Sequence, residues 1–498
     1  MPAETYPRAV STPGRNDATS LSSRRGVAIL ILLCLVQFMD VLDASILNIA
    51  LPSIKRDLGF TQESLQWVVN GYIITYGGFL LLGGRVADLL GRRRILVTGL
   101  VVFATASLVG GLSHSESLLI GARFAQGMGA AMLSPAALST LTTIFRSGRE
   151  RNTALGAWAA VSGLGGAAGV LFGGLLTEGP GWRWVLFVNV PFAAIALVGA
   201  LVLLERERGS GRLAHFDALG AVLVTGGMLL LVYSLVKAPD VGWGATRTIG
   251  GLALAGVALA SFVVNELRVP NPLVPMSILR VKGVAVADAT QLVTAIGFLP
   301  MFFFLTLYMQ TVLDYSPIQT GVAYLPLTAG FIVASSISSQ LFARIGTKPV
   351  IVVGAVIASG GLYWLSRIPV DGSYVSDILP GLLVSSIGLG GVFVGATTAA
   401  NAGVSEDKAG LAAGLLNTGT QLGGALGLAV FSALATERTT SLLRGGDTTV
   451  AHAATDGFQL ALMVGAFFVL AAGAVAMLAR NNRQSAAVEE QPALDLAA

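Results

Sequence analysis

The chain has 498 residues and a net charge of +4; 54% of the residues are hydrophobic, 12% are charged, and the mean hydropathy is +0.75. Because a soluble globular domain carries about 25% charged residues, this composition excludes a soluble protein and predicts an integral membrane protein. One cysteine and three widely separated histidines exclude an internal disulfide and offer no ligand set for a metal or a haem, so we expect no metal site and no cofactor.

Fourteen apolar segments are long enough to cross a bilayer, whose core takes about 20 residues of helix. Continuous apolar runs such as GVAILILLCLVQFM exclude the alternating segments of a transmembrane barrel, so the chain is predicted to be all-α. The predicted spans are 27–51, 65–84, 95–112, 118–143, 153–176, 185–204, 216–237, 249–268, 285–312, 318–343, 349–366, 377–402, 409–434 and 458–479.

The basic residues predict the orientation of these spans, because cytoplasmic loops carry an excess of Lys and Arg. Of the 31 Lys and Arg residues, 22 lie on the side of the two termini, eight lie on the other side, and Arg123 lies within a span. Both termini are therefore predicted to be cytoplasmic, with the protein in the inner (cytoplasmic) cell membrane. The basic residues flank the spans, so they indicate orientation and not binding to nucleic acid.

A weak internal repeat divides the chain. A shift of 255 residues aligns GRRRILVTG (91–99) with GTKPVIVVG (346–354), and a shift of 261 aligns GMGA (127–130) with GLGG (388–391). We infer two homologous six-helix halves with a substrate site between them near the bilayer midplane. The predicted domains are a disordered tail (1–26), an N-terminal six-helix bundle (27–204), a linker with two inserted helices (205–284), a C-terminal six-helix bundle (285–480) and a second tail (481–498).

Several segments resemble a known family. The loop GRVADLLGRRRIL (84–96) resembles the signature loop of the major facilitator superfamily, with its key places held by Gly84, Asp88, Gly91, Arg92 and Arg93. Other segments resemble the fourteen-helix drug:proton antiporters of that superfamily: LDASILNIALP (42–52), RFAQGMGAA (123–131), WRWVLFVNVP (182–191), LYMQTVLDYSPIQTG (307–321) and AAGLLNTGTQLGGALG (412–427). The resemblance covers about residues 25–480. It implies a major facilitator fold with 14 helices arranged as 6+2+6.

The fifth span is similar to the antiporter motif of that family but departs from it at one place. In GGAAGVLFGG (165–174), Val170 stands where the motif usually has proline. The glycines that the motif requires are Gly165, Gly169, Gly173 and Gly174. Close helix packing is therefore expected without a proline kink.

Ionisable residues inside the membrane are costly and therefore mark function. The first span carries Asp40 and Asp43 on one polar face with Gln37, and Arg123 of the fourth span is predicted at a similar depth to Asp43. An arginine partner favours the charged carboxylate, and burial without one favours the protonated form. We expect Asp43 first, or Asp40, to exchange a proton, with Arg123 stabilising the charged form; the alternative is a purely structural Asp–Arg pair.

Other candidates are weaker. Asp288 is either a second coupling carboxylate or a solvated residue near a helix start. Asp88, Arg92 and Arg93, with the two loop glycines, are expected by the resemblance to form a conformational latch, and the arginines also determine topology. Candidate residues of a substrate pocket are polar or aromatic: Gln37, Asn48, Phe302, Tyr308, Gln310, Asn417 and Gln421.

The resemblance implies a proton-coupled antiporter, not an enzyme, that exports drugs or other amphipathic, cationic small molecules by alternating access. The chain has no GxxxxGK[ST] segment for ATP, so a proton gradient is the expected energy source. The alternatives are a dedicated exporter of one metabolite or antibiotic, and a proton symporter. The expected partners are protons, an amphipathic substrate and lipid, and a monomer is expected.

Overall fold

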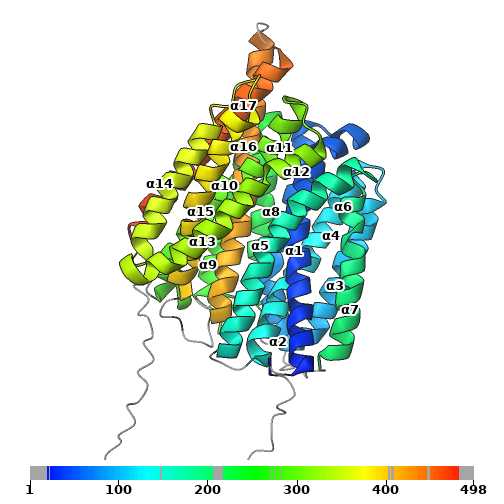
Figure 1. Cartoon of the computed structure of the whole chain (residues 1–498), viewed down its shortest axis with the longest axis vertical. Helices are drawn as coiled ribbons and strands as arrows, with labels where there is room; N and C mark the ends of the chain where they lie inside the picture. The colour runs from blue at the N-terminus through cyan, green and yellow to red at the C-terminus, as the bar shows by residue number, and fades with distance from the viewer. Residues whose placement is uncertain are drawn as a thin grey trace, which may run out of the picture.

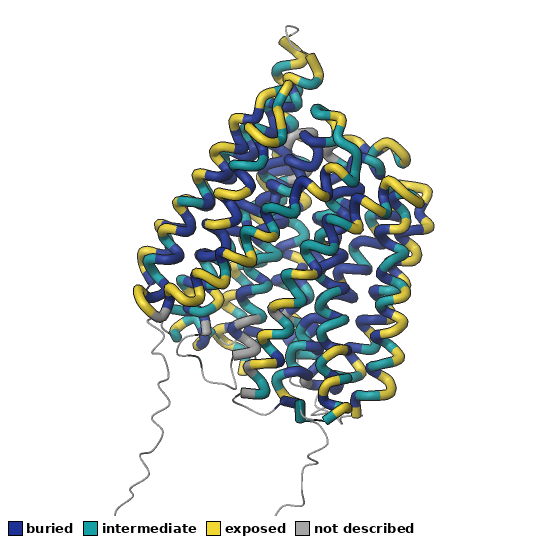
Figure 2. Tube along the Cα trace, viewed as in Figure 1, coloured by how far each residue is buried: buried dark blue, intermediate teal, exposed yellow. Residues whose placement is uncertain are grey.

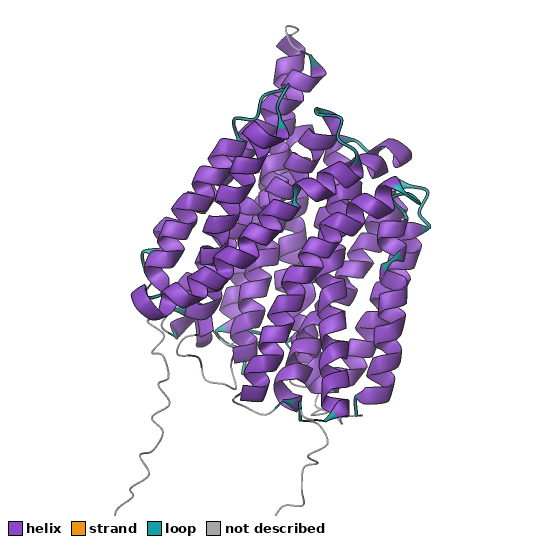
Figure 3. Ribbon diagram, viewed as in Figure 1, coloured by secondary structure: helices purple, strands orange, loops and turns teal. Residues whose placement is uncertain are grey.

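The computed structural model describes residues 20–21, 23–145, 149–205, 217–270, 272–274, 276–281, 283–401, 404, 409–445, 449–479 and 481. Within these residues all regular structure is helical, and Figure 3 shows no strand in the part of the chain that it describes. Most of the two predicted tails and of the charged segment 205–212 lies outside the described residues.

The first part of the chain forms nine helices. Their bounds are α1 (Arg24–Leu58), α2 (Gln62–Leu90), α3 (Arg92–Gly111), α4 (Glu116–Ile144), α5 (Arg149–Glu178), the short α6 (Trp184–Phe187), α7 (Asn189–Leu203), α8 (Ala218–Val241) and α9 (Thr246–Glu266). After a short 3-10 turn, η3 (Ile278–Arg280), the remaining elements are α10 (Val284–Phe298), α11 (Pro300–Thr311), α12 (Pro317–Ala323), α13 (Leu325–Ile345), α14 (Thr347–Leu365), the π-helical turn η4 (Tyr374–Ile378), α15 (Leu379–Asn401), α16 (Ala409–Gly445) and α17 (Val450–Ala476).

Twelve helical stretches among the described residues are long and apolar enough to cross a membrane. The two other predicted spans fall on α2 and α4, which are each 29 residues long and carry polar side chains. Those polar residues include Gln66 and Asn70 in α2 and Arg123 and Gln126 in α4, all of them buried inside the protein. The number of fourteen spans stays a prediction.

The outside of the bundle suits a lipid environment. Large apolar side chains are exposed along the outward faces of several helices, including Ile195 and Val202 on α7, Val257 on α9 and Val333 on α13. In water such contiguous apolar surface would drive association. Figure 2 shows exposed positions along the outer helices and buried positions between helices.

Two groups of helices lie side by side, as Figure 1 shows, and the start of α1 and the end of α17 lie toward the same, lower end of the molecule in this view. In the first group α1 packs on α5 and α7, while α4 packs on α2 and α3. In the second group α15 packs on α13 and α14, while α17 packs on α10, α14 and α16. The pair α8–α9 joins them, since α8 contacts both α2 and α16.

The two groups share a local construction where the sequence repeat aligns them. Gly91 links α2 to α3 at φ 100°, and Gly346, its counterpart in the repeat, links α13 to α14 at φ 87°. Only glycine adopts such a conformation without strain. Gly129 of α4 lies against Phe103 of α3, and Gly388 of α15 lies against Ala358 of α14, although the repeat aligns Gly388 with Gly127 and not with Gly129.

Several predicted spans differ in detail from the helices observed. The span predicted at 285–312 is broken between α10 and α11 at Leu299, before Pro300, because proline lacks the N–H that would continue the helix. The span predicted at 318–343 is broken at Tyr324, two residues before Pro326. The span predicted at 409–434 continues as helix to Gly445, so that α16 and α17 project beyond the other helices at the end remote from the chain termini (Figure 1).

Candidate functional site

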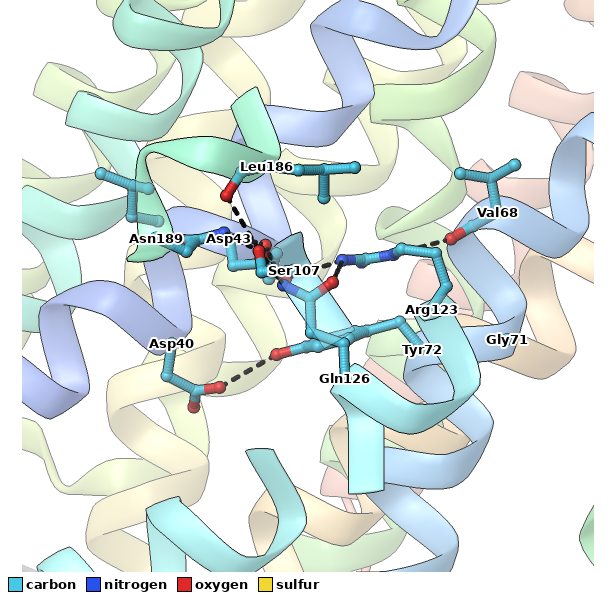
Figure 4. Close-up of polar contacts among 12 residues, drawn as sticks. Asp40, Asp43, Val68, Gly71, Tyr72, Ser107, Arg123, Gln126, Leu186 and Asn189 are labelled. Atoms are coloured by element: carbon cyan, nitrogen blue, oxygen red, sulfur yellow. Dashed lines mark hydrogen bonds and ion pairs between the residues drawn. The ribbon is translucent and has the colours of Figure 1, made fainter. Parts of the chain in front are cut away.

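A buried ion pair lies at the centre of the first helix group. Arg123 of α4 donates from Nη1 to Oδ2 of Asp43 in α1 over 2.8 Å, and the side chains are 2% and 0% exposed. Arg123 Nε also donates to the carbonyl oxygen of Val68 at 3.0 Å, and its guanidinium lies 4.3 Å from the centre of the Tyr72 ring. Figure 4 shows these groups converging between α1, α2 and α4.

Amide side chains complete the surroundings of this pair. Gln126 Nε2 donates to Asp43 Oδ1 at 2.7 Å, and its Oε1 accepts from Arg123 at 2.6 Å. Asn189 Nδ2 donates to the same Asp43 oxygen at 2.6 Å. Ser107 Oγ accepts from both amides and donates to the carbonyl oxygen of Leu186 (Figure 4). Asp43 is thus held by a cation and two further hydrogen-bond donors.

The local sequence explains how these side chains meet. Arg123 and Gln126 are three residues apart, so they lie on one face of α4. The break between α6 and α7 at Val188 puts Asn189 at the first position of α7. Ser107 lies on α3, where its hydroxyl reaches the carbonyl at the end of α6. Side chains of four helices, α1, α3, α4 and α7, and backbone carbonyl oxygens of α2 and α6 therefore contribute to one set of hydrogen bonds.

The second carboxylate of α1 has different partners. Tyr72 donates its hydroxyl to Asp40 Oδ1 at 2.9 Å, and Tyr76 donates to Asp40 Oδ2 at 2.5 Å. Asp40 is 4% exposed, and within the described residues no basic side chain pairs with it. The two carboxylates lie three residues apart, but a guanidinium balances the charge of Asp43 alone.

Tyr76 connects Asp40 to the second helix group. The hydroxyl of Tyr76 interacts with the side chain of Ser134 in α4 and with that of Asn417 in α16. Close by, a Cβ added at Gly77 would lie 3.2 Å from the Cβ of Gln421, so α2 and α16 are in direct contact here. A change at Asp40 can therefore reach the other half through a single tyrosine.

The glycines of α5 mediate two different contacts. Added Cβ atoms at Gly165 and Gly173 would lie 3.0 Å from the carbonyl oxygen of Phe38 and 2.7 Å from that of Ile46, and Gly169 lies against Ser45, all in α1. Gly174 instead lies against the backbone of Pro317 and Ile318 in α12, with a Cβ contact of 2.7 Å. Small residues let these backbones approach closely. Val170, where the motif usually has proline, stays within a continuous helix and its carbonyl oxygen faces Gly321.

Further contacts between the halves lie at the end remote from the chain termini. Gln310 Nε2 of α11 donates to the carbonyl oxygen of Ile49 in α1 at 2.9 Å. The backbone N–H of Ile318 in α12 donates to Glu178 Oε2 at the end of α5 over 3.1 Å. Together with Gly174 these contacts join the halves at that end.

The motif at the junction of α2 and α3 makes several contacts, and the side chain of Asp88, near the end of α2, lies outside the described part. Arg93 donates to the carbonyl oxygens of Ala200 (3.2 Å) and Leu201 (2.7 Å) at the end of α7. Arg92 Nη1 donates to Thr143 Oγ1 at 2.6 Å in α4. Gly84 lies 3.4 Å, measured from an added Cβ, from Pro135. These contacts stay inside the first helix group.

Asp288 lies on α10, apart from the two carboxylates of α1. It is half-buried, and among the described residues neither of its carboxylate oxygens has a hydrogen-bond partner. Its backbone carbonyl faces Gly419 of α16, the helix that also carries Asn417. The second helix group thus contains its own unpaired carboxylate.

The remaining pocket candidates fall in different places. Gln37 donates to Ser162 of α5 at 2.8 Å, and within the described part of the chain Asn48 bonds only the carbonyl oxygen of Ala44 in its own helix. Phe302 lies 5.4 Å from the ring of Tyr324. Tyr308 is fully buried and donates to Pro369 O at 2.6 Å, so it packs the end of α11.

Sequence reasoning missed five residues of the two networks: Tyr72, Tyr76, Ser107, Gln126 and Asn189. The spacing of Arg123 and Gln126 on one helix face was an available signal, and so was the four-residue spacing of the two tyrosines on α2. Nothing in the sequence shows which helix those faces contact. Ser107 and Asn189 have no pattern that marks them.

Comparisons with known proteins show which family the chain belongs to. The family model described as Major Facilitator Superfamily matches residues 33–428. This chain belongs to the Major Facilitator Superfamily. It is therefore a membrane transporter of the cell membrane, with many membrane-spanning helices, and its family consists of transporters rather than enzymes.

Relatives within the superfamily are antibiotic resistance and export proteins. The chain is 40% identical over 470 residues to the puromycin resistance protein pur8 of Streptomyces alboniger, covering 92% of each chain. It is 41% identical to the cephamycin export protein CmcT of Amycolatopsis lactamdurans, covering 85% of this chain and 87% of that protein. The lincomycin resistance protein of Streptomyces lincolnensis is 32% identical over 98% of both chains.

Solved structures show the same fold at low sequence identity. The POT family transporter PepTSo aligns with a TM-score of 0.66 at 14% identity, over 90% of this chain and 97% of that chain. A bacterial homologue of the human lysosomal transporter Spinster, in an inward-facing and unoccupied conformation, aligns with a TM-score of 0.65 at 16% identity, over 91% and 97%.

Proposed function

We propose that this transporter is a proton-coupled antiporter that exports amphipathic, cationic small molecules of the antibiotic class across the cytoplasmic membrane. The export direction and the substrate class are inferred from the relatives, whose names refer to puromycin, cephamycin and lincomycin. Both termini are cytoplasmic in this proposal, and α2 and α4 cross the membrane, which gives fourteen spans as 6+2+6. The transporter acts as a monomer.

The observation that carries the coupling mechanism is the difference between Asp40 and Asp43. A proton on Asp43 would leave the charge of Arg123 buried without its partner, which is strongly unfavourable. Asp40 has only hydroxyl donors, so its protonation strands no cation. We therefore assign the exchanged proton to Asp40, and the structural stabilisation of the first half to the Asp43–Arg123 pair.

Tyr76 provides the link to alternating access. With Asp40 charged, the Tyr76 hydroxyl donates to the carboxylate. A proton on Asp40 removes that charged acceptor and frees the hydroxyl to donate to Asn417 of α16. Protonation then changes a contact between the two halves, which is what a rocking mechanism requires.

The unpaired Asp288 fits a role in substrate charge recognition or as a second coupling carboxylate. A cationic substrate would find a partner there in the second half while Asp40 carries the proton. Exchange of one proton for one monovalent cation moves no net charge. The pH gradient is then the driving force, and the membrane potential contributes nothing.

The test is transport by purified protein in proteoliposomes under an imposed pH gradient, with tetraphenylphosphonium as the probe. Asp40→Asn should abolish pH-driven accumulation while leaving binding of the probe within about threefold. Asp456→Asn, a half-buried Asp on α17, is the matched control and should transport normally. Full pH-driven transport by Asp40→Asn would overturn the assignment, and transport by the unmodified protein that ignores the gradient would overturn proton coupling.

A second candidate is a dedicated exporter of one antibiotic, because each named relative refers to one compound class. A panel of cationic dyes and of puromycin-, cephamycin- and lincomycin-type compounds in the same vesicles separates the two. Transport of a single class would favour the dedicated exporter, and transport of several unrelated cations would favour the broad one.

A further inference from the structure

A cavity of about 570 Å³ lies in the second half at the end remote from the chain termini. Its lining comes from the turn before α12, from α12 itself and from the π-helical turn η4. This volume is in the range of sites for small organic molecules, about 300–1,000 Å³. None of its lining residues belongs to the networks around Asp40 and Asp43.

Irregular backbone builds this cavity from two sides. On one side α12 ends at Ala323 and α13 resumes at Leu325–Pro326, and both Ala323 and Pro326 line the cavity. On the other side η4 is π-helical, and its first residue Tyr374 lines the cavity. Non-helical backbone within a membrane protein is tolerated where it lines a cavity, and π-helical turns are frequent at functional sites.

The lining is aromatic and aliphatic. Tyr315 and Tyr374 both line the cavity, and Ile318 and Val322 add aliphatic surface. The Tyr374 hydroxyl already donates to the carbonyl oxygen of Ala323 at 2.9 Å, so its ring is what it offers to a ligand. Tyrosine rings stabilise cations placed over their faces.

The surroundings of the cavity are acidic. Asp314, which has a φ of 55°, directly precedes Tyr315, and Asp377 belongs to η4. Asp371 and Asp377 both act electrostatically on Tyr308, as Tyr315 does. The neighbouring cation Arg367 is held by Tyr363, to whose hydroxyl it donates. Among the described residues, no Lys or Arg lines the cavity.

The cavity is continuous with the seam that joins the two halves at this end. Ile318 lines the cavity, its N–H donates to Glu178 of α5, and its backbone packs against Gly174. Any opening of this end separates α12 from α5. A molecule that leaves through the seam therefore passes the cavity.

We propose that this cavity is a release-side binding site for aromatic organic cations, distinct from the site around Asp40 and Asp43. The term release-side rests on the proposed function, because this end of the molecule is extracellular only if both termini are cytoplasmic. The tyrosine rings and aliphatic side chains bind the aromatic groups, and Asp314, Asp371 and Asp377 attract the positive charge. Such a site holds the exported molecule after the seam closes behind it.

The test is protection of an introduced thiol by tetraphenylphosphonium in the full-length protein, with Cys34 replaced by serine. Val322→Cys lies in the cavity and is 48% exposed in the native residue, while Val241→Cys, at the same end on α8 and 39% exposed, is the matched control. We expect tetraphenylphosphonium to slow labelling of Val322→Cys about fivefold and to leave Val241→Cys unchanged. If Val322→Cys does not fold, Gln319→Cys reports on the same lining.

Three comparisons identify the chemistry. Tetramethylammonium, which lacks rings, should not protect the thiol. Tyr374→Phe keeps the ring and should retain protection, whereas Tyr374→Ala should lose it. Asp371→Asn should weaken protection about twofold to fivefold at low salt and less at high salt.

Repeating the same assay with Asp40→Asn, which the proposed function predicts to be inactive, separates binding in the cavity from transport. Protection that persists there supports the cavity site even if proton coupling fails. Equal labelling with and without tetraphenylphosphonium would overturn the proposal, and so would equal slowing of the Val241→Cys control. Labelling that is slow in lipid nanodiscs, fast in lipid-free detergent and unaffected by the cation would assign the cavity to a lipid chain instead.

Discussion

Gln310 of α11 donates a hydrogen bond of 2.9 Å to the backbone carbonyl oxygen of Ile49 in α1. The bond joins a side chain of the second half to the backbone of the first. It lies at the end of the molecule where α5 also meets α12. A rocking motion that opens this end must break it, so the bond contributes directly to the balance between conformations.

Removing this bond should therefore shift that balance. We expect Gln310→Ala to favour the state that is open at this end by about 0.5–1.5 kcal/mol, the net value of one hydrogen bond. Spin labels at the exposed residues Leu175 on α5 and Val322 on α12 would report the shift as a larger population of long distances. Thr311→Ala is the control, since among the described residues the Thr311 hydroxyl bonds only the carbonyl oxygen of Leu307 in its own helix. Unchanged distances in Gln310→Ala would refute the role of this bond.

The buried ion pair should be essential for stability and intolerant of a lysine. Asp43→Asn leaves Arg123 without a counter-charge, which costs about 3–5 kcal/mol for a fully buried pair. Arg123→Lys should also destabilise the protein. A single ammonium nitrogen cannot occupy the positions of both Nε, which bonds Val68, and Nη1, which bonds Asp43 and Gln126. Thermal melting in detergent measures both losses.

A surface pair of equal length is the control for this prediction. Arg183 and Asp57 also lie 2.8 Å apart, but their side chains are 30% and 45% exposed. Asp57→Asn should change stability by less than about 1 kcal/mol. The double variant Asp43→Asn/Arg123→Gln should recover part of the loss, because it removes the uncompensated charge. Equal melting of Asp43→Asn and Asp57→Asn would contradict the structural role of the buried pair.

The glycine face of α5 predicts a strong position dependence. Gly173→Leu should destabilise the protein by about 1–3 kcal/mol through overpacking against the α1 backbone. Gly166→Leu should have little effect, because nothing lies within 4 Å of an added Cβ there. Melting temperatures of the two variants, seven residues apart on one helix, provide the comparison. A loss at Gly166 equal to that at Gly173 would show that the helix tolerates no side chain anywhere.

Arg93 should act as a structural tie between α3 and α7. Arg93→Ala removes two hydrogen bonds to carbonyl oxygens at the end of α7, where a positive charge is also favourable. We expect a loss of about 1–3 kcal/mol in stability and slower transport with unchanged probe binding. Arg94→Ala, at the exposed neighbouring position, should be near neutral in the same melting and vesicle assays. Normal transport by Arg93→Ala would limit its role to membrane topology.

The helical class and the approximate spans could be predicted from the sequence because twenty-residue apolar runs have few other uses. The positions at which helices break could not be predicted as well from the sequence. Pro300 and Pro326 were visible in the sequence, but a transmembrane helix can keep a proline, as α1 keeps Pro52 and α4 keeps Pro135. Only packing against neighbouring helices decides between a kink and a break.

The charged residues of the candidate site could be predicted from the sequence, whereas its neutral residues could not. Asp40, Asp43 and Arg123 stood out because ionisable residues are rare in apolar spans. Their division into a paired and an unpaired carboxylate was not accessible, because it depends on which face of α1 meets α4 and which meets α2. Tyr76 and Asn189 look like isolated polar residues at the ends or on one face of apolar helices until that arrangement is known.

The length of α16 has a mechanical consequence. Its 37 residues extend about 56 Å at 1.5 Å per residue, well beyond a hydrocarbon core of about 30 Å. Thr439 of α16 donates to Ala453 O of α17, which ties the projecting ends together as a stiff hairpin. This hairpin belongs to the second half and works as a lever. A small rotation of that half becomes a large sideways displacement at the hairpin tip, which a single fluorophore there would follow in real time.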